Sequence, residues 1–430
     1  MIFTGVCKDL ANDGKGLVEY DNTIVLVDNL LPGEKAEIEI YKKLSKCSYG
    51  KVKKYITTSS KRVEPMCPYY DQCGGCQLMH LKTKEQLIFK QNQIKQAFKR
   101  IANLDLYVAD PISSNNFGYR NKIEMPVQSG KIGFYKNGTN HLIPITNCKL
   151  VDSKTNDLIR RISRIIKEQN PPIKNVVLRR SFKLDQTMLI LVSEEKNFEG
   201  KEHLCKKIIE QISEITTIVQ NVNNNKFVTL SNNSIVLYGP GYIEDEILNT
   251  RFLVSASSFY QVNAYQTEGL YSEALELAKI RKTDVVLDAY CGVGTIGIIA
   301  SKYAKKVYGV EINAEAIKDA KKNSKINKIS NIKFICKDAK KFIKREANDA
   351  NILIIDPPRA GCDKEFLDKV IEKRFKKIIY ISCDYQTLAR DIKILNPYYE
   401  IKKVQPVDMF PNTYHVETIV LLTLREIVKD

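Results

Sequence analysis

Residues 285–297 read Val285-Val286-Leu287-Asp288-Ala289-Tyr290-Cys291-Gly292-Val293-Gly294-Thr295-Ile296-Gly297. The short apolar run at its start predicts a buried β-strand, and a helix is expected to begin near its end. The three glycines between these elements have the spacing G-x-G-x-x-G. Glycine lets the backbone approach a nucleotide-like ligand closely, so Gly292 is a candidate cofactor contact. Dinucleotide-dependent dehydrogenases share this spacing, which therefore indicates a class of ligand but not a reaction.

Four more strand-like runs follow, with helical segments between them, and this alternation predicts a doubly wound α/β sheet over residues 251–430. The runs are Val307–Glu311, Asn331–Cys336, Asn351–Ile355 and Ile378–Ile381. One of these runs ends in an acidic residue, and two others are closely followed by one. The carboxylate of Glu311 can accept both hydroxyls of a ribose, and Asp338 can reach the edge of the ligand's base. Asp356 opens the sequence Asp-Pro-Pro-Arg.

Cys383 follows the last of these runs, at the edge of the sheet where open α/β folds bind their ligands. The next segment is helical in character, and Asp384 can cap it. A helix N-terminus lowers the pKa of a nearby thiol, which makes Cys383 a candidate nucleophile. The alternative is a small buried residue, which many free cysteines are.

The chain has 430 residues and a formal net charge of +17, which favours a polyanionic partner such as nucleic acid. Eleven cysteines, an odd number spread unevenly, indicate reduced thiols or metal ligands in the cytoplasm and not a disulfide framework. The N-terminal residues do not resemble a signal peptide, and no stretch has the apolar length of a membrane span. We expect no membrane association and no obligate protein partner.

Residues 1–60 contain short strand-like runs separated by polar turns, a pattern that predicts a small barrel of the OB type. Lysines and tyrosines alternate in its second half. Cations beside aromatic rings suit phosphate contact and base stacking, although a solvated basic face would have the same composition.

Residues 61–250 predict an α+β domain, mostly antiparallel, that begins with a cysteine cluster. Cys67, Cys73 and Cys76 have the spacing C-x5-C-x2-C, and Cys148 is the best candidate for a fourth ligand. Four thiolates suit either zinc or an iron–sulfur cluster. Further along, Arg179, Arg180 and Lys183 are expected to contact phosphate or to lie on an exposed basic hairpin.

Several motifs of the C-terminal half resemble those of a known family, the class I S-adenosylmethionine-dependent RNA uracil-5-methyltransferases. The matching segments are Phe259–Asn263, Asp288–Thr295, Asp356–Gly361, Ser382–Cys383 with Thr387–Asp391, and His415–Thr418. Residues 13–16 and 25–34 resemble a TRAM domain, an RNA-binding β-barrel, and the N-terminal cysteines resemble the branch of the family that carries a [4Fe-4S] cluster. One departure is Asp384-Tyr385-Gln386, where many relatives have Asn-Pro-Ala.

The resemblance implies a Rossmann-like class I methyltransferase sheet and a role for each matching residue. Cys383 is then the nucleophile and Glu417 the base. S-Adenosylmethionine contacts the following residues: Gln261, Tyr290, Glu311 and Asp356. The cluster, with zinc as the less favoured occupant, is held by four residues: Cys67, Cys73, Cys76 and Cys148. The implied partner is RNA, with 23S rRNA as the first substrate and the T-loop of tRNA as the alternative.

The chemistry of these roles is coherent, because C5 of uracil is a poor nucleophile until a thiolate adds to C6. C5 can then attack the sulfonium methyl group, and a carboxylate can remove the C5 proton. A uracil in folded RNA must be turned out of its stack to reach these groups, and Phe259 is a candidate for stacking on it. Two other classes stay open at this stage. One is an RNA chaperone with an inactive catalytic domain, and the other is an iron–sulfur oxidoreductase that uses a dinucleotide.

Overall fold

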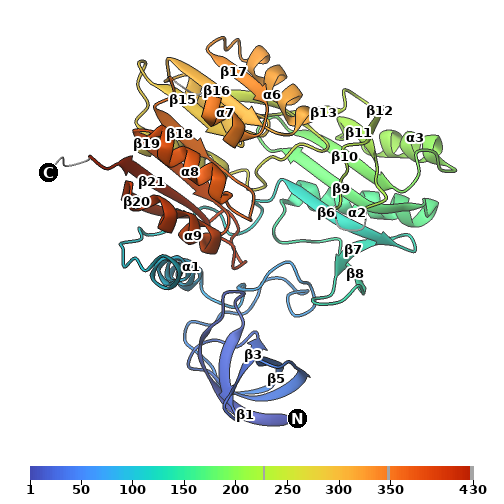
Figure 1. The fold of residues 1–430 in the computed structure, drawn as a ribbon. Helices are drawn as coiled ribbons and strands as arrows, with labels where there is room; N and C mark the ends of the chain where they lie inside the picture. Colours follow the sequence, from blue (N-terminus) through green and yellow to red (C-terminus); the bar gives the residue numbers. More distant parts are fainter. Residues whose placement is uncertain (226–227, 346–348, 427–430) are drawn as a thin grey trace.

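The computed structural model describes residues 1–225, 228–345 and 349–426, which form a barrel and two large sheets. Figure 1 shows the barrel at one end of the molecule, with helix α1 (Thr83–Ala97) between it and the C-terminal sheet. A π-helical turn, η1 (Phe98–Ala102), extends α1. The expected fold class is confirmed, since an N-terminal barrel precedes a methyltransferase-type sheet.

The N-terminal barrel is closed, with the strand order β1-β2-β3-β5-β4. Its strands are β1 (Ile2–Leu10), β2 (Gly16–Tyr20), β3 (Thr23–Asp28), β4 (Lys35–Lys43) and β5 (Cys47–Thr57). Alternate residues point inward, so that Val18, Val25 and Ile38 are fully buried. The sequence pattern indicated β2 to β5 but not β1, whose alternation is interrupted by a bulge between Cys7 and Asp9.

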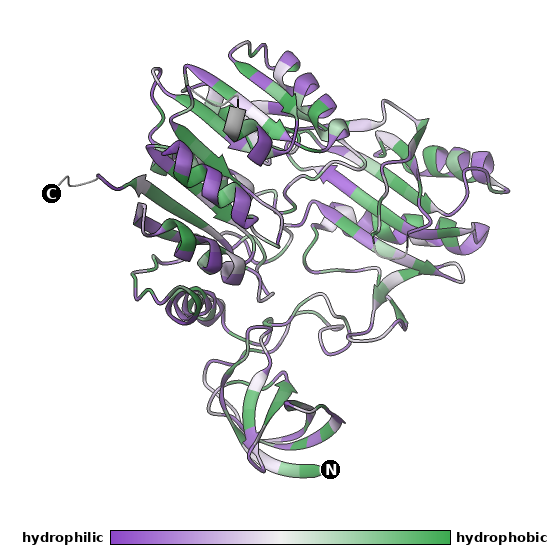
Figure 2. Ribbon diagram, in the orientation of Figure 1, coloured by the Kyte–Doolittle hydropathy of each residue, from purple (hydrophilic) through white to green (hydrophobic). Residues whose placement is uncertain are grey.

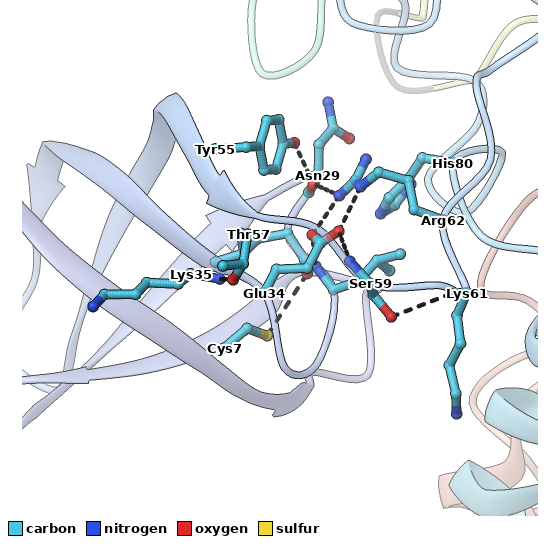
Figure 3. Close-up of polar contacts among 12 residues, drawn as sticks. Cys7, Asn29, Glu34, Lys35, Tyr55, Thr57, Ser59, Lys61, Arg62 and His80 are labelled. Atoms are coloured by element: carbon cyan, nitrogen blue, oxygen red, sulfur yellow. Dashed lines mark hydrogen bonds and ion pairs between the residues drawn. The ribbon is translucent and has the colours of Figure 1, made fainter.

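A buried ion pair joins the barrel to the segment that follows it (Figure 3). The guanidinium of Arg62 donates to both carboxylate oxygens of Glu34, each at 2.6 Å, and a third bond from Arg62 reaches the carbonyl of Asn29 at 2.6 Å. Glu34 is fully buried, and the Ser59 amide also donates to it at 3.0 Å. This two-pronged contact fixes the direction in which the chain leaves the barrel.

The central sheet has seven strands in the order β12-β11-β10-β9-β6-β7-β8. These are β6 (Lys122–Gln128), β7 (Lys131–Tyr135), β8 (Leu142–Pro144), β9 (Ile173–Ser181), β10 (Gln186–Ser193), β11 (Thr217–Val222) and β12 (Ser234–Tyr238). Helices α2 (Ser153–Gln169) and α3 (Lys201–Gln211) share a hydrophobic core with it. Residues of its other face, such as Met188 and Ile190, pack into a core shared with the C-terminal sheet.

Arg179 and Arg180 of β9 are not on the surface, which corrects the expectation from sequence, whereas Lys183 is exposed in the turn after β9 and forms an ion pair with Glu268. Arg179 and Arg180 are only 3% and 4% exposed. Arg180 forms an ion pair with Asp152, while Arg179 donates to backbone carbonyls of the catalytic domain. Both guanidinium groups have protein partners because a buried cation without one is strongly destabilising.

The C-terminal sheet has the order β17-β16-β15-β18-β19-β21-β20. Its strands are β15 (Val285–Ala289), β16 (Lys306–Glu311), β17 (Ile332–Cys336), β18 (Ile352–Ile355), β19 (Lys377–Ser382), β20 (Tyr399–Val407) and β21 (Glu417–Leu424). The connecting helices are α5 (Thr295–Ser301), α6 (Ala314–Ile326), α7 (Ala339–Arg345), α8 (Lys364–Lys373) and α9 (Tyr385–Leu395). A hairpin of β13 (Tyr242–Ile247) and β14 (Thr250–Ser255), followed by α4 (Gln266–Ala278), precedes them.

Strands β15 to β19 are parallel to one another, whereas β21 pairs antiparallel with both β19 and β20. Figure 2 shows hydrophobic residues along these strands and hydrophilic ones on the outer faces of the covering helices. Parallel strands buried on both faces carry near-continuous apolar runs, as Ile352–Ile355 does. The parallel strands β15, β16 and β18 bring Ala289, Glu311 and Ile355 to one edge of the sheet.

Candidate active site

A first pocket lies where β15 and β16 end, and residues of the glycine-rich turn line it. Its lining residues include Gly292, Glu311, Ser258 and Phe259. The amide of Gly292 donates to the Glu311 carboxylate at 3.3 Å, so the turn and the acidic strand end meet as the sequence predicts. Phe259 is 72% exposed and belongs to this pocket, not to the one that holds Cys383. Its expected position beside a uracil at the nucleophile is therefore not what the structure shows.

Two glycines of the turn are required by close contacts. A Cβ on Gly297 would lie 2.5 Å from the Oδ2 atom of Asp288, and Gly294 has a φ of +82° with Phe334 only 2.7 Å from its Cβ position. Gly292 has a φ of +53° and open space around it, which leaves its backbone free to meet a ligand. Burial and the charge of Asp356 raise the pKa of Asp288 well above its usual range, while the facing Gly297 amide opposes this shift.

Four candidate cofactor contacts lie outside the lining of this pocket: Gln261, Tyr290, Asp338 and Asp356. Gln261 is 5% exposed, and its carbonyl accepts a hydrogen bond from the Asn121 side chain at 3.1 Å. Tyr290 has a φ of +65°, and its ring centroid lies 5.4 Å from that of Phe366. The Asp338 carboxylate accepts from the Lys340 amide at 2.9 Å, at the start of α7.

A second pocket surrounds the thiol of Cys383, which is half-buried just beyond the end of β19. Its lining residues are Asn12, Asp13, Arg359, Cys383, Asp384, Tyr385, Gln386, Tyr414, His415 and Val416. The Asp384 carboxylate accepts from the amides of Gln386 and Thr387 at 3.0 and 2.9 Å, which confirms its predicted role as the cap of α9.

Cys383 directly follows β19, and Glu417 is the first residue of β21. The last pair between these antiparallel strands is Ser382 with Thr418, so Cys383 and Glu417 are the next residues at the same end of the pair, and the charge of Glu417 acts on the Cys383 thiol. Glu417 is 4% exposed, so it is a buried acid and not a charge at a solvated strand edge.

Proton affinities in this second pocket are strongly shifted. Burial, reinforced by the Asp356 charge, raises the pKa of Glu417 to about 8, and Arg359 opposes the shift. Burial alone raises the pKa of Asp356 to about 7. Burial and the Glu417 charge raise the pKa of Cys383 to about 11. A thiol pKa lowered by the helix N-terminus is therefore not what this pocket shows, and Arg359 is the group that favours the thiolate.

The loop that carries Arg359 is held by α9. The Thr387 hydroxyl donates to the Arg359 carbonyl at 3.0 Å, and Arg390 donates to the carbonyl of Ala360 at 2.9 Å. Asp391 accepts from the Cys362 amide at 2.8 Å and from the Tyr380 hydroxyl at 2.7 Å. The Thr-Leu-Ala-Arg-Asp motif therefore positions the Asp-Pro-Pro-Arg loop, a role that sequence reasoning left unassigned.

The four predicted cluster cysteines come close to one another. Burial raises the pKa of Cys76, and the neighbouring thiols of Cys148, Cys73 and Cys67 raise it further. Within residues 1–225, 228–345 and 349–426, however, no three His, Cys, Asp or Glu side chains are arranged as ligands of a metal ion. The donor set fits a thiolate-bound metal in kind and number, whereas the side-chain geometry does not by itself define such a site.

Comparisons with known proteins extend over nearly the whole chain. A model of the family described as tRNA (Uracil-5-)-methyltransferase matches residues 82–425. The chain belongs to this family.

An RNA methyltransferase described as uncharacterized from Clostridium acetobutylicum is 42% identical over 437 residues, covering 96% of this chain and 95% of that protein. One from Clostridium tetani is 40% identical over 434 residues, covering 96% and 94%. Among solved structures, the tRNA (uracil-54, C5)-methyltransferase of Pyrococcus abyssi in complex with S-adenosyl-L-homocysteine has a TM-score of 0.80 and 26% identity. It covers 98% of this chain and all of that one.

The protein is therefore an RNA uracil-5-methyltransferase whose methyl donor is S-adenosylmethionine. This assignment replaces the two alternatives that the sequence left open, an RNA chaperone and a dinucleotide-dependent oxidoreductase. None of the helices in the described ranges combines the length and apolar character needed to cross a bilayer.

Two contributions to the methyltransferase site were not singled out from the sequence. In the sequence Arg359 is only the last residue of the Asp-Pro-Pro-Arg motif, yet its charge lowers the pKa of both Cys383 and Glu417 against the effect of burial. Asn12 and Asp13 reach the same pocket from the barrel, and no local pattern connects a turn near residue 12 with a thiol at 383.

Proposed function

We propose that the protein methylates C5 of a uridine through a covalent bond between Cys383 and C6 of the base. The register that sets Cys383 beside the buried acid Glu417 is the observation that carries this proposal. Nucleophile and base then reach the same pyrimidine ring from adjacent strands.

The Cys383 thiolate adds to C6, and C5 attacks the methyl group of the sulfonium, which releases S-adenosylhomocysteine. Glu417 removes the proton from C5, and elimination of the thiolate restores the C5–C6 double bond. Burial keeps the Cys383 thiol and the Glu417 carboxyl protonated near neutral pH. Arg359 is therefore proposed to stabilise the Cys383 thiolate before it adds to C6.

The methyl donor is proposed to lie against the glycine-rich turn, with its sulfonium directed toward Cys383. In this arrangement the Glu311 carboxylate accepts the ribose hydroxyls and the amide of Gly292 lies against the ligand. The remaining proposed contacts are Gln261, Tyr290, Asp338 and Asp356. The contact between Gly292 and Glu311, together with their shared pocket, supports this position.

The substrate is proposed to be 23S rRNA, in keeping with the TRAM-like barrel and the cysteine cluster. The barrel carries an exposed set of cations and aromatic rings, such as Lys42, which lies 5.8 Å from the ring centroid of Tyr49. A tRNA substrate is the second candidate. The Pyrococcus abyssi structure favours tRNA as the substrate, because it covers 98% of this chain and the enzyme is named as a tRNA (uracil-54, C5)-methyltransferase.

Tritium release from RNA labelled at uridine C5 tests the reaction and separates the two substrates. Unmodified 23S rRNA and tRNA would be incubated in parallel with the protein and S-adenosylmethionine. Release from 23S rRNA that is lost in Cys383→Ala supports the proposal, and release from tRNA alone transfers it to the second candidate. No release from either RNA would contradict the reaction itself.

We further propose that Cys67, Cys73, Cys76 and Cys148 hold a [4Fe-4S] cluster that fixes the start of the central domain. The proposal is supported by the neighbouring thiols, which raise the pKa of Cys76 and of Cys148, as expected of thiols that lie close together. The three units 1–60, 61–250 and 251–430 would then act as an RNA-binding barrel, a cluster domain and a catalytic domain. Iron and sulfide analysis of protein purified without oxygen tests the cluster, and one equivalent of zinc with no iron would contradict it.

A further inference from the structure

The turn between β1 and β2, residues 11–15, lies beside the pocket that holds Cys383. Asn12 and Asp13 line this pocket together with Cys383, Tyr385 and His415. The charge of Asp13 also acts on the hydroxyl of Tyr385, which follows the cap of α9. The barrel therefore supplies part of the wall around the nucleophile as well as a separate basic surface.

Backbone hydrogen bonds give this turn a defined shape. The Ala11 amide donates to the Lys15 carbonyl at 2.7 Å, and the Gly14 amide donates to the Ala11 carbonyl at 2.9 Å. Gly14 has a φ of +82°, and a Cβ there would lie 2.8 Å from the Leu78 side chain. A turn closed in this way holds the side chain of Asn12 in a limited region of space.

An apolar cluster fixes the turn relative to the catalytic domain. Leu10 and Leu31 of the barrel share this cluster with Leu78 and with Phe89 of α1, and Tyr414 packs against it. Leu10 directly precedes the turn, and Tyr414 itself lines the pocket. Packed side chains therefore hold the turn beside the segment that carries Tyr414, which lines the same pocket as Cys383.

The chemistry of this wall suits a base edge or a ribose better than a phosphate. Asp13 carries a carboxylate, which repels phosphate and accepts hydrogen bonds from amino or hydroxyl groups. Lys15 holds it in place, with Nζ 2.7 Å from Oδ2. Asn12 is exposed, and its amide presents a donor and an acceptor side by side, the pairing that reads a base edge.

We propose that the β1–β2 turn reads the nucleotide next to the target uridine, with Asn12 as a specificity-determining residue. This inference rests on the proposed function, since it needs a uridine turned out toward Cys383. The neighbouring nucleotide is joined to that uridine by one phosphodiester, so it must lie close to the pocket, and Asn12 is an exposed residue of the pocket lining. The barrel then helps to select the uridine and does more than hold RNA by charge.

The test uses the full-length protein and short RNAs derived from whichever RNA releases tritium with wild type. The nucleotides immediately 5′ and 3′ of the target uridine would be varied one at a time, and kcat/KM measured for each RNA. We expect wild type to prefer one neighbour. Asn12→Ala should reduce that preference about tenfold, the typical effect of losing one amide–base contact, while the weaker RNAs change little.

Two control variants separate base reading from general effects on the barrel. Asn22 is exposed in the β2–β3 turn, lies outside the pocket lining and has a φ of +54°, so Asn22→Gly removes the same amide without strain. Lys43 is exposed on β4, and Lys43→Ala should raise KM equally for every RNA. Neither control should alter the preference.

The inference is overturned if wild type shows no preference, if Asn12→Ala keeps it, or if Asn22→Gly loses it equally. Failure of the proposed function has a different signature, because wild type would then release no tritium from any RNA in the panel. Circular dichroism of each variant checks that the barrel is intact.

Discussion

Arg179 of β9 donates a hydrogen bond to the carbonyl oxygen of Ser258, at 2.9 Å, and a second one to the carbonyl of Ser255, at 3.1 Å. Both serine hydroxyls lie within 2.8 Å of the Asp319 carboxylate on α6. The segment that leads into Phe259 and Gln261 is thus held between the central domain and the catalytic sheet. A buried arginine of one domain therefore supports the wall of the proposed cofactor pocket in the other.

The first prediction concerns this support. Arg179→Lys cannot make both carbonyl contacts at once, so the 255–259 segment should lose its position and the Kd for S-adenosylhomocysteine should rise about tenfold. Isothermal titration calorimetry measures this. Arg180→Lys is the matched control, because Arg180 is equally buried but pairs with Asp152. Both variants should lose stability, and an equal loss of affinity in Arg180→Lys would contradict the prediction.

The second prediction concerns the contact between Asp288 and Gly297. Gly297→Ala places a methyl group 2.5 Å from Asp288 Oδ2, within a buried strand–helix packing, and should lower the free energy of unfolding by about 2–3 kcal/mol. Gly292→Ala meets open space and costs only the left-handed backbone conformation, about 1 kcal/mol. Urea denaturation distinguishes the two, and equal losses would show that steric contact is not the cause.

The third prediction concerns pH and activity. As the proposed base, Glu417 has to be ionised before it can accept the C5 proton, and its pKa is raised to about 8. We expect the rate of tritium release to increase as pH rises through about 8 in single-turnover experiments. Glu417→Gln should still form the covalent complex but release no tritium, so protein–RNA adduct should accumulate on denaturing gels. A Glu417→Gln variant that releases tritium at the wild-type rate would exclude this residue as the base.

The same group makes a fourth prediction, about stability. Because the folded pKa of Glu417 lies above its unfolded value of about 4.5, the folded state binds more protons between pH 4.5 and 8. Its contribution to stability is therefore full below pH 4.5 and is lost as pH rises through 8. In Glu417→Gln, the loss of folding stability between pH 4.5 and 8 should be smaller than in wild type by a few kcal/mol. Thermal melts at pH 5 and pH 8.5 measure it, and parallel declines in both proteins would refute it.

A fifth prediction concerns the buried pair of Lys90 and Asp408. The Lys90 ammonium lies 2.6 Å from Asp408 Oδ1 and also donates to the Phe410 carbonyl, which ties α1 to the segment before Tyr414. Lys90→Met leaves a buried carboxylate without its cation and should cost about 3–5 kcal/mol of stability. The double variant with Asp408→Leu should recover part of this loss in urea titrations. A double variant no more stable than Lys90→Met would mean that charge burial is not the cause.

Local sequence patterns were sufficient for the parallel strands β15 to β19, but not for the antiparallel strands β20 and β21. They were also sufficient for residues whose role depends on a neighbour in the chain. The cap at Asp384 needs only the two amides that follow it, and the meeting of Gly292 with Glu311 follows from parallel strands ending at one edge. Arg179 and Arg180 were misjudged because their partners lie on other elements. The shifted pKa of Cys383 has the same origin, since burial and a strand from the end of the chain cause it.

Strand β1 and the position of Asn12 in the pocket wall could not be predicted either, because both depend on residues that are distant in the sequence. A bulge hides the alternation of β1, and closure of the barrel through β1–β4 pairing depends on residues far along the chain. Nothing near Asn12 indicates a nucleophile. The contact between the barrel turn and the pocket exists because a hydrophobic cluster from three separate segments packs them together.

The antiparallel strand β21 lies between β19 and β20 although it follows both of them in the chain. During synthesis, the edge of β19 therefore stays unpaired until residues 417–424 have left the ribosome. Helix α9, which positions Arg359, also forms before that last strand is present. The proposed base arrives in that last strand. A nascent chain could bind RNA through its barrel well before it could modify it, so the order of synthesis separates capture of a transcript from its chemistry.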